Sequence, residues 1–312
     1  MAHGKLNDFD LTAQSWYPVF RSRQIRRNTV KTAHVLNRKI AVFRDSKGRP
    51  HALDARCSHM GADLGVGRVV NDCLQCPLHR WEYDVDGLVR KAPFEATVPK
   101  RRVRAYPSED RYGYIWIFNG PRPLFDLLKV DDRRFFSFIL PSQVFNNHPH
   151  FLTANGLDWR HMSTLHEMEL AKNSTCRRKG PYGVVVEHQL RPTPKWLKLA
   201  TGTTRRFLHA SFETSGSNSA LITVGDPPEF HLMFSNTPLN DRRTRTRPVI
   251  FLSRENPFSF LSSLWQYLIL TFFVLLRQDH KIFETTDFVP GFTDVDDAFE
   301  LFAEVIDALP TY

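Results

Sequence analysis

Cysteine is scarce in this chain. Its 312 residues include four, at positions Cys57, Cys73, Cys76 and Cys176. Four cysteines are a thin basis for the disulfide framework on which small secreted domains depend. The N-terminal segment, Met1 to Asp10, also lacks an apolar stretch that would read as a secretory or export signal. We therefore expect the protein to work in a reducing, cytoplasmic compartment.

Acidic side chains are fewer than basic ones, 33 against 42, which gives a formal net charge of +9. The basic residues are dispersed in small clusters such as Lys100 to Arg104, and no nucleic-acid-binding motif accompanies them. A nucleic acid partner is therefore not expected. A solvated basic face is the simplest interpretation, and a docking surface for an acidic protein is the functional alternative.

The first part of the chain has the pattern of short strands. Apolar segments, including His34 to Phe43 and Pro50 to Leu53, alternate with turn-forming clusters. A further apolar strand near Tyr112 is followed by a Gly/Pro-rich break at Gly120. These features predict a small antiparallel β domain over residues 14–120.

The remaining residues, 121–312, mix helix and strand patterns. Helices are expected at Ala154 to Leu170, around Leu261 to Thr286, where the pattern is apolar, and at Asp294 to Ala308, where it is acidic. Five apolar runs between the first two helices predict a sheet: Gly183 to Leu190, Phe207 to Glu213, Ser219 to Val224, Glu229 to Ser235 and Pro248 to Leu252. The predicted fold class is therefore α+β.

Two cysteines and two histidines form two mixed pairs, Cys57-Ser-His59 and Cys76-Pro-Leu-His79. In a Rieske 2Fe-2S centre, two thiolates hold one iron and two imidazoles hold the other. Structural zinc is the competing interpretation, but zinc sites usually pair their ligands as C-x2-4-C and H-x3-5-H. The mixed pairs favour the iron–sulfur cluster.

The longer stretch from Cys57 to Gly87 resembles the Rieske domain of ring-hydroxylating oxygenases. Respiratory-type Rieske proteins carry an extra cysteine in each ligand loop and a serine shortly after the second histidine, where this chain has Ala62, Leu78 and Trp81. Arg80 stands where the oxygenase family usually has glycine. The resemblance implies a 2Fe-2S cluster that is bound by four residues: Cys57, His59, Cys76 and His79.

A second motif, Asn155-x2-Asp158-x2-His161-x4-His166, resembles the N-x2-D-x2-H-x4-H motif of the same family. On a regular helix His166 would point about 140° away from His161, so the helix must break or widen there. A zinc protease would use H-x3-H, so the spacing speaks against that alternative. The resemblance implies a mononuclear Fe(II) site of His161, His166 and a carboxylate, Asp279, on the C-terminal helix.

Asp158 resembles the family's bridging carboxylate. In relatives this residue bonds an iron-ligating histidine of its own subunit and a Rieske histidine of the next subunit in a head-to-tail trimer, which would be His79 here. The alternative for Asp158 is a helix N-cap or a solvated carboxylate. Near Asp279, His280 is the rival ligand. The nearby carboxylates of Glu284 and Asp287 are more simply solvated or bonded to a ligand without touching the metal.

The segment 258–276 has no charged side chain and is long enough to span a bilayer at about 1.5 Å per residue. Asp279 follows almost at once, however, and it cannot reach His161 if its helix leaves the domain. A buried core helix is therefore favoured, ahead of peripheral membrane contact and of a true span.

Over nearly its whole length the chain resembles the terminal oxygenase α-subunit of Rieske non-haem iron oxygenases. The resemblance implies an all-β Rieske domain followed by a helix-grip (START-like) α+β catalytic domain. It also implies a homotrimer, O2 as co-substrate, and electrons from NAD(P)H through a separate reductase, with or without a ferredoxin.

The expected reaction is hydroxylation or oxidative demethylation of a hydrophobic substrate of aromatic, steroid or terpenoid-like character. Monooxygenation is favoured over cis-dihydroxylation because the compact chain resembles relatives that work without a β-subunit. The alternative from another class is a Rieske electron carrier fused to a lipid-binding helix-grip module, which would not need the second metal site.

Overall fold

The structure is a computed structural model that describes residues 4–170, 174–191, 207–239, 241–254, 265–271, 279–286, 288–289, 291–293 and 296–312. The chain divides into two compact units. The N-terminal unit comprises Gln14–Leu124 with Tyr312, and the C-terminal unit comprises Met1–Ala13 with Phe125–Thr311. Each unit is described by itself below.

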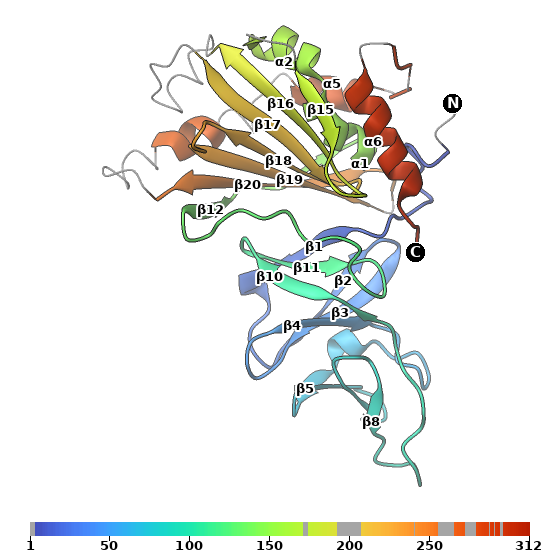
Figure 1. Ribbon diagram of the computed structural model, residues 1–312. Coiled ribbons are helices and arrows are strands. Elements are labelled where there is room, and N and C mark those ends of the chain that lie inside the picture. The colour runs from blue at the N-terminus through green and yellow to red at the C-terminus, as the bar shows by residue number, and fades with distance from the viewer. Residues whose placement is uncertain are drawn as a thin grey trace. The chain divides into compact units, whose positions relative to one another are not determined.

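The N-terminal unit consists of three small antiparallel sheets (Figure 1). The first sheet orders β1 (Trp16–Arg21), β11 (Tyr114–Phe118) and β10 (Ser108–Arg111). The second orders β2 (Val30–Val35), β3 (Arg38–Arg44), β4 (Pro50–Asp54) and β9 (Ala105–Tyr106). The third orders β5 (Arg68–Val70), β6 (Cys73–Gln75), β7 (Glu82–Tyr83) and β8 (Val89–Lys91). Two short 3-10 helices, η1 (Ser22–Gln24) and η2 (Leu64–Val66), lie in the connections.

Strand β3 is buried on both faces, because its alternating side chains enter two different hydrophobic clusters. Ala41 and Phe43 lie in the cluster that also contains both predicted cysteine ligands, and Ile40 and Val42 lie in the other. The predicted continuous segment His34 to Phe43 is instead a hairpin. Its turn consists of Leu36 and Asn37, both with a φ of 57°, and apolar periodicity alone did not locate this turn.

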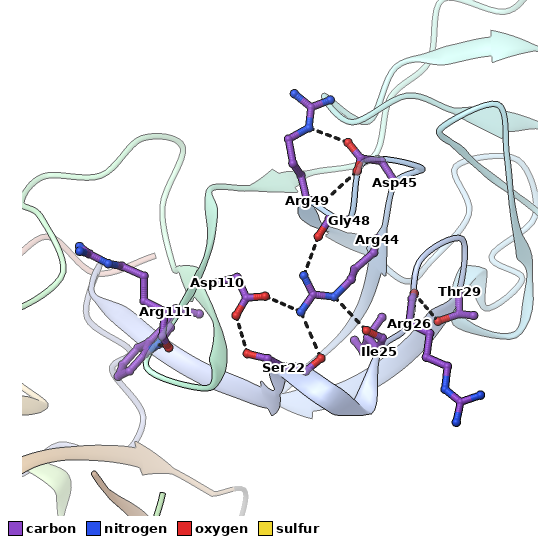
Figure 2. A network of polar contacts seen from close by, with 11 residues as sticks. Ser22, Ile25, Arg26, Thr29, Arg44, Asp45, Gly48, Arg49, Asp110 and Arg111 are labelled. Carbon is purple, nitrogen blue, oxygen red and sulfur yellow. Dashed lines mark hydrogen bonds and ion pairs between the residues drawn. The ribbon is translucent and has the colours of Figure 1, made fainter. Parts of the chain in front are cut away.

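The buried Arg44 ties together three parts of the N-terminal unit, as Figure 2 shows. Its guanidinium donates hydrogen bonds to the carbonyl oxygens of Ile25 (2.9 Å), Gly48 (2.6 Å) and Ser22 (3.1 Å), and it pairs with the carboxylate of Asp110. Because the planar guanidinium offers several donors in a fixed arrangement, one side chain can satisfy carbonyls from several loops at once.

The C-terminal unit is built on one antiparallel sheet of nine strands (Figure 1). Its main path is β12 (Phe135–Ile139), β20 (Thr244–Ser253), β19 (Phe230–Pro238), β18 (Ser219–Val224), β17 (Leu208–Ser215), β16 (Val184–Arg191) and β14 (Glu169–Leu170). Strand β13 (Gln143–Phe145) pairs with β20, and β15 (Thr175–Arg178) pairs with β16. The five predicted apolar runs correspond to β16–β20, whereas the short strands β12–β15 were not predicted.

Helices cover one face of this sheet. Among the described residues they include α1 (Pro149–Ala154), the 3-10 helix η3 (Asn155–Leu157), α2 (Trp159–His166), α5 (Asp279–Thr285) and α6 (Asp297–Ala308). Phe302, Val305 and Ile306 of α6 pack in one cluster with Val184 and Phe212 of the sheet. The predicted α+β class is confirmed.

The predicted helix from Ala154 to Leu170 is in fact three helical segments followed by a strand. Asp158 has an extended backbone and separates η3 from α2, and residues after His166 leave the helix for β14. Within the predicted helix from Leu261 to Thr286, residues 265–271 and α5 are helical, and Leu270 is fully buried in a sheet cluster. Residues 258–264 and 272–278 lie outside the described residues. Within the described parts of the chain, no helix has the length and apolar character needed to cross a bilayer.

Candidate metal centres

The first predicted ligand pair lies in a tight loop between β4 and η2. The Cys57 N–H donates to the carbonyl of Ala62 (2.9 Å), and the Gly61 N–H donates to the carbonyl of Cys57 (2.9 Å). Gly61 has a φ of 79°, a left-handed conformation that glycine adopts without steric cost. The loop therefore folds back on itself and holds Cys57 and His59 at its tip.

The second pair lies in the loop between β6 and β7, which is closed in the same way. The Cys76 N–H donates to the carbonyl of Trp81 (2.8 Å), and the Arg80 N–H donates to the carbonyl of Cys76 (3.2 Å). Arg80 has a φ of 58°. Arg80 stands where the similar family usually has glycine, and its backbone adopts the left-handed conformation that glycine would take, although it carries a long side chain.

The two loops bring like ligands together. The thiols of Cys57 and Cys76 are buried, at 4% and 2% exposure, and lie within hydrogen-bond reach of each other. The rings of His59 and His79 meet edge to face, with centroids 4.6 Å apart. Burial raises the pKa of the Cys76 thiol, and the N–H groups of Leu78 and His79 oppose that shift. This pairing of thiol with thiol and imidazole with imidazole suits a cluster in which each iron takes one kind of ligand.

The second predicted site begins at the N-terminus of α2. The side chain of Asp158 caps this helix by accepting hydrogen bonds from the backbone N–H groups of Arg160 (2.9 Å) and His161 (3.2 Å). Arg160 also pairs with the carboxylate of Asp296. The N-cap role that the sequence left open for Asp158 is therefore present, and it fixes the start of the helix that carries both predicted histidines.

Helix α2 does not break between His161 and His166, but its last turn is wide. Glu167, which has a φ of 54°, donates its N–H to the carbonyl of Met162, five residues earlier. A bond over five residues opens the turn relative to the usual four. The Nε2 atoms of His161 and His166 consequently lie 2.9 Å apart, with ring centroids at 4.6 Å.

A profile of the Rieske [2Fe-2S] domain family matches residues 15–107. The chain contains a Rieske domain. Among similar proteins, cholesterol 7-desaturase nvd 1 of Ciona intestinalis is 31% identical over 159 residues, which are 48% of this chain and 34% of the relative. The oxygenase component of 3-ketosteroid-9-alpha-monooxygenase from Rhodococcus rhodochrous is 31% identical over 110 residues, which are 35% of this chain and 29% of the relative. The matched regions thus span about a third of these relatives.

Solved structures resemble the chain over much more of its length. Dicamba monooxygenase bound to 3,6-dichlorosalicylic acid superposes with a TM-score of 0.71 and 17% identity, covering 96% of this chain and 97% of that one. The NdmA QL mutant of Pseudomonas putida CBB5 with caffeine gives a TM-score of 0.67 and 18% identity, covering 93% and 88%. At these identities the likeness establishes the fold. The homologues and structural neighbours are Rieske non-haem iron oxygenases.

The residues of the Rieske domain fit the cluster. The Nδ1 atom of His59 is buried and has no hydrogen-bond partner among the described residues. A buried, unpartnered nitrogen is costly unless a metal or another group satisfies it. The four predicted ligands therefore offer buried thiols and a buried imidazole nitrogen to which iron would bind: Cys57, His59, Cys76 and His79.

Two residues next to the cluster ligands were not predicted as functional. Trp81 stacks on His59 with a centroid distance of 4.5 Å and an interplanar angle of 3°, and the Tyr83 hydroxyl lies 3.1 Å from the Sγ atom of Cys57. The same hydroxyl accepts a hydrogen bond from the N–H of Ser58 (3.1 Å). Burial raises the pKa of Tyr83, which keeps its phenol protonated. The available signal was the spacing of Trp81 and Tyr83, two and four residues beyond His79.

The His161–His166 pair fits two ligands of one metal ion. Two nitrogens bound at about 2.1 Å and at right angles lie about 3 Å apart, close to the separation in α2. Among the described side chains, no three of His, Cys, Asp and Glu gather around a common point. The side chain of the third predicted ligand, Asp279, lies outside the described part of the structure, as do the side chain of His280 and the whole of Asp287.

Helix α5, which begins at Asp279, nevertheless lies beside α2. The ring of Phe283 on α5 is nearly parallel to that of His161, with centroids 6.4 Å apart. The side-chain amide of Asn147 donates hydrogen bonds to the carbonyls of Phe283 (3.1 Å) and Thr286 (2.7 Å), which anchors the end of α5. These contacts hold α5 close to the histidine pair.

Proposed function

We propose that this chain is the terminal oxygenase component of a Rieske non-haem iron oxygenase system. It would use O2 and electrons relayed from NAD(P)H through a separate reductase, with or without a ferredoxin, to hydroxylate or oxidatively demethylate a hydrophobic substrate. The observation that carries this proposal is the 2.9 Å separation of the His161 and His166 Nε2 atoms in a chain that also contains a Rieske domain. An electron carrier has no need for such a second pair.

The chain's residues divide the work between two centres. Cys57, His59, Cys76 and His79 would hold the 2Fe-2S cluster, and the Fe(II) would be held by three residues: His161, His166 and Asp279. When bound, the cluster would supply one-electron transfer and the mononuclear iron would supply the chemistry of O2 activation. The widened last turn of α2 presents both histidines on one side. Burial of His166 keeps bulk water from its ring.

Asp158 has two roles in this proposal. It caps α2 in its own subunit, and in a head-to-tail homotrimer it would accept a hydrogen bond from His79 of a neighbouring copy. Its two N–H bonds both use the Oδ1 atom, and its side chain remains 29% exposed, which supports access by a second group. A carboxylate between two imidazoles would orient both rings and favour their protonated nitrogens as donors.

The names of the relatives support the proposed substrate class. Two of them are named for cholesterol and 3-ketosteroid, and another is aminopyrrolnitrin oxygenase PrnD of Pseudomonas fluorescens. A polycyclic or aromatic hydrophobic molecule is therefore the proposed substrate. Monooxygenation is favoured over cis-dihydroxylation, because two of the similar proteins, the 3-ketosteroid and dicamba enzymes, are named monooxygenases.

We propose a cytoplasmic location for the reaction. The apolar segment 258–276 is the part of the chain proposed to contact a membrane if the protein associates with one.

Metal analysis tests the proposal. Anaerobically purified wild type is expected to hold about three iron and two acid-labile sulfide per chain, which is one iron beyond a 2Fe-2S cluster. The double variant His161→Ala/His166→Ala should hold about two of each. If both proteins hold two and two, even after excess Fe(II) is supplied, the oxygenase proposal fails and a Rieske electron carrier with a lipid-binding domain takes its place. If wild type holds the third iron, product analysis with O2 and a reductase separates insertion of one oxygen atom from insertion of two.

A further inference from the structure

A narrow apolar cavity lies between α2 and the sheet of the C-terminal unit. Six of the side chains that line it are Trp159, Met162, Met168, His188, Leu190 and Phe212. Met162 neighbours the predicted iron ligand His161 on the same helix. Five of these six side chains present hydrocarbon, sulfur or indole surface to the cavity, and His188 is the sixth. The cavity has a volume of about 40 Å³, which is room for a small oxygen-bearing edge of an otherwise apolar molecule next to the helix of the proposed iron site.

His188 is the exception among these six residues. It lies on β16 between Val186 and Leu190, whose side chains face the same side of the sheet because strand side chains alternate. The residue is 7% exposed. Its Nδ1 atom lies 2.7 Å from the hydroxyl oxygen of Ser174, which fixes the orientation of the ring.

The other ring nitrogen, His188 Nε2, is buried and has no hydrogen-bond partner among the described residues. Leaving a buried polar nitrogen unpaired in an apolar environment is energetically unfavourable. Burial also lowers the pKa of His188 to about 4, so the ring is neutral at physiological pH and can offer one nitrogen as donor or acceptor. The unpaired atom therefore has the properties of a hydrogen-bonding point for a neutral ligand.

We infer that His188 is a substrate-binding residue that recognises a single hydroxyl or carbonyl oxygen on an otherwise hydrophobic substrate. Ser174 holds the imidazole so that Nε2 serves the ligand. When Ser174 donates to Nδ1, Nε2 carries the proton and selects a carbonyl or ether oxygen; in the other tautomer Nε2 accepts from a hydroxyl. This inference rests on the proposed function and adds the substrate's polar group to it.

The test uses three probes that share one hydrocarbon skeleton: decalin, 2-decalone and decahydro-2-naphthol. Their binding to the full-length protein is measured by titration calorimetry, which requires no reductase and no turnover. Wild type is expected to bind at least one of the oxygenated probes about tenfold more tightly than decalin, the size of one neutral hydrogen bond. His188→Leu should lose this preference and bind decalin at least as tightly as wild type does.

His231→Leu is the matched control. His231 is also a buried histidine of the same sheet, bonded through Nδ1 to Thr223 (2.8 Å), and burial lowers its pKa to about 4 as well, but it does not line the cavity. This variant should keep the preference for the oxygenated probe. Ser174→Ala, which leaves the imidazole in place but removes its support, should reduce the preference without abolishing binding, and it remains informative if His188→Leu does not fold.

The inference is overturned if wild type binds none of the probes, if it binds all three equally, or if His188→Leu keeps the preference. These outcomes are separate from the iron count. A protein that lacks the mononuclear iron but shows the His188-dependent preference would retain the binding site and lose only the oxygenase proposal. A protein with three iron and no preference would retain the oxygenase proposal and lose this one.

Discussion

The hydroxyl of Tyr83 lies 3.1 Å from the Sγ atom of Cys57, and it joins a cluster ligand to the strand that follows the second ligand loop. A hydrogen bond to a ligating sulfur stabilises the more negative, reduced form of an iron–sulfur cluster. Tyr83→Phe is therefore expected to lower the reduction potential of the cluster, as measured by redox titration followed by EPR. The cluster itself should still assemble.

Tyr106→Phe is the control for that change, because its hydroxyl bonds the carboxylate of Asp54 (2.6 Å) and not a cluster ligand. This variant should leave the potential unchanged. An equal potential in wild type and Tyr83→Phe would show that the phenol does not donate to the sulfur in the assembled centre.

The third iron ligand can be identified by substitution. Asp279→Ala is expected to remove about one iron per chain while the acid-labile sulfide and the visible spectrum of the cluster stay constant. Glu284→Ala on the same helix is the comparison, since the Glu284 carboxylate already accepts a hydrogen bond from Asn146 Nδ2 (2.6 Å). Loss of iron from Glu284→Ala and not from Asp279→Ala would transfer the ligand role to Glu284.

The Arg44 network predicts a large effect on stability in the N-terminal unit. Arg44 is 8% exposed, and Arg44→Ala removes the guanidinium that bonds three backbone carbonyls and pairs with Asp110. The free energy of unfolding in urea should fall by about 3 kcal/mol. Arg90→Ala removes an ion pair with Asp84 in which the arginine side chain is 60% exposed, and it should cost under about 1 kcal/mol. Similar costs for the two variants would contradict the structural role given to Arg44.

Gly156 lies where η3 meets the sheet, and a side chain does not fit there. A Cβ atom at this position would lie 1.8 Å from the ring of Phe212, which is buried. Gly156→Ala must displace either the ring or the segment that leads into α2, at an expected cost of about 1–3 kcal/mol and with weakened binding of the mononuclear iron. Gly291→Ala, with no atom of the described residues within 4 Å of the added Cβ, should match wild type in thermal unfolding and iron content. Unchanged iron in Gly156→Ala would show that α2 keeps its position.

Buried histidines make the C-terminal unit sensitive to acid. Burial lowers the pKa of His148 and of His231 to about 4, against about 6.5 in an unfolded chain. Between pH 6.5 and 4 the unfolded state therefore binds protons that the folded state does not, and stability is lost as the pH falls through this window. Each residue accounts for at most about 2 kcal/mol between pH 7 and 5.

His231→Gln removes one of these groups, so the loss of unfolding free energy between pH 7 and 5 should shrink by up to about 2 kcal/mol in urea titrations at the two pH values. His34→Gln, at an exposed position on β2, should leave that loss as it is in wild type. An identical loss in His231→Gln and wild type would mean that the buried ring takes up its proton without unfolding.

The sequence by itself determined the features that depend on short spacings. Cys57 and His59 lie two residues apart, and Cys76 and His79 lie three apart, so a single loop sets the position of each ligand pair. Alternation of apolar residues located β16–β20, because strand side chains point to opposite faces with a period of two. The five-residue step from His161 to His166 required a widened helix, and α2 ends in one.

Only the tertiary structure decided which distant groups meet. Tyr83 reaches Cys57 and Trp81 stacks on His59 because two loops that are distant in the sequence fold against each other. In the sequence His188 is one of several residues on an apolar strand. Its hydrogen bond to Ser174 and its place in the cavity wall are visible only in the structure. Local periodicity reports which face of an element is buried, whereas contacts between elements depend on packing that no single segment encodes.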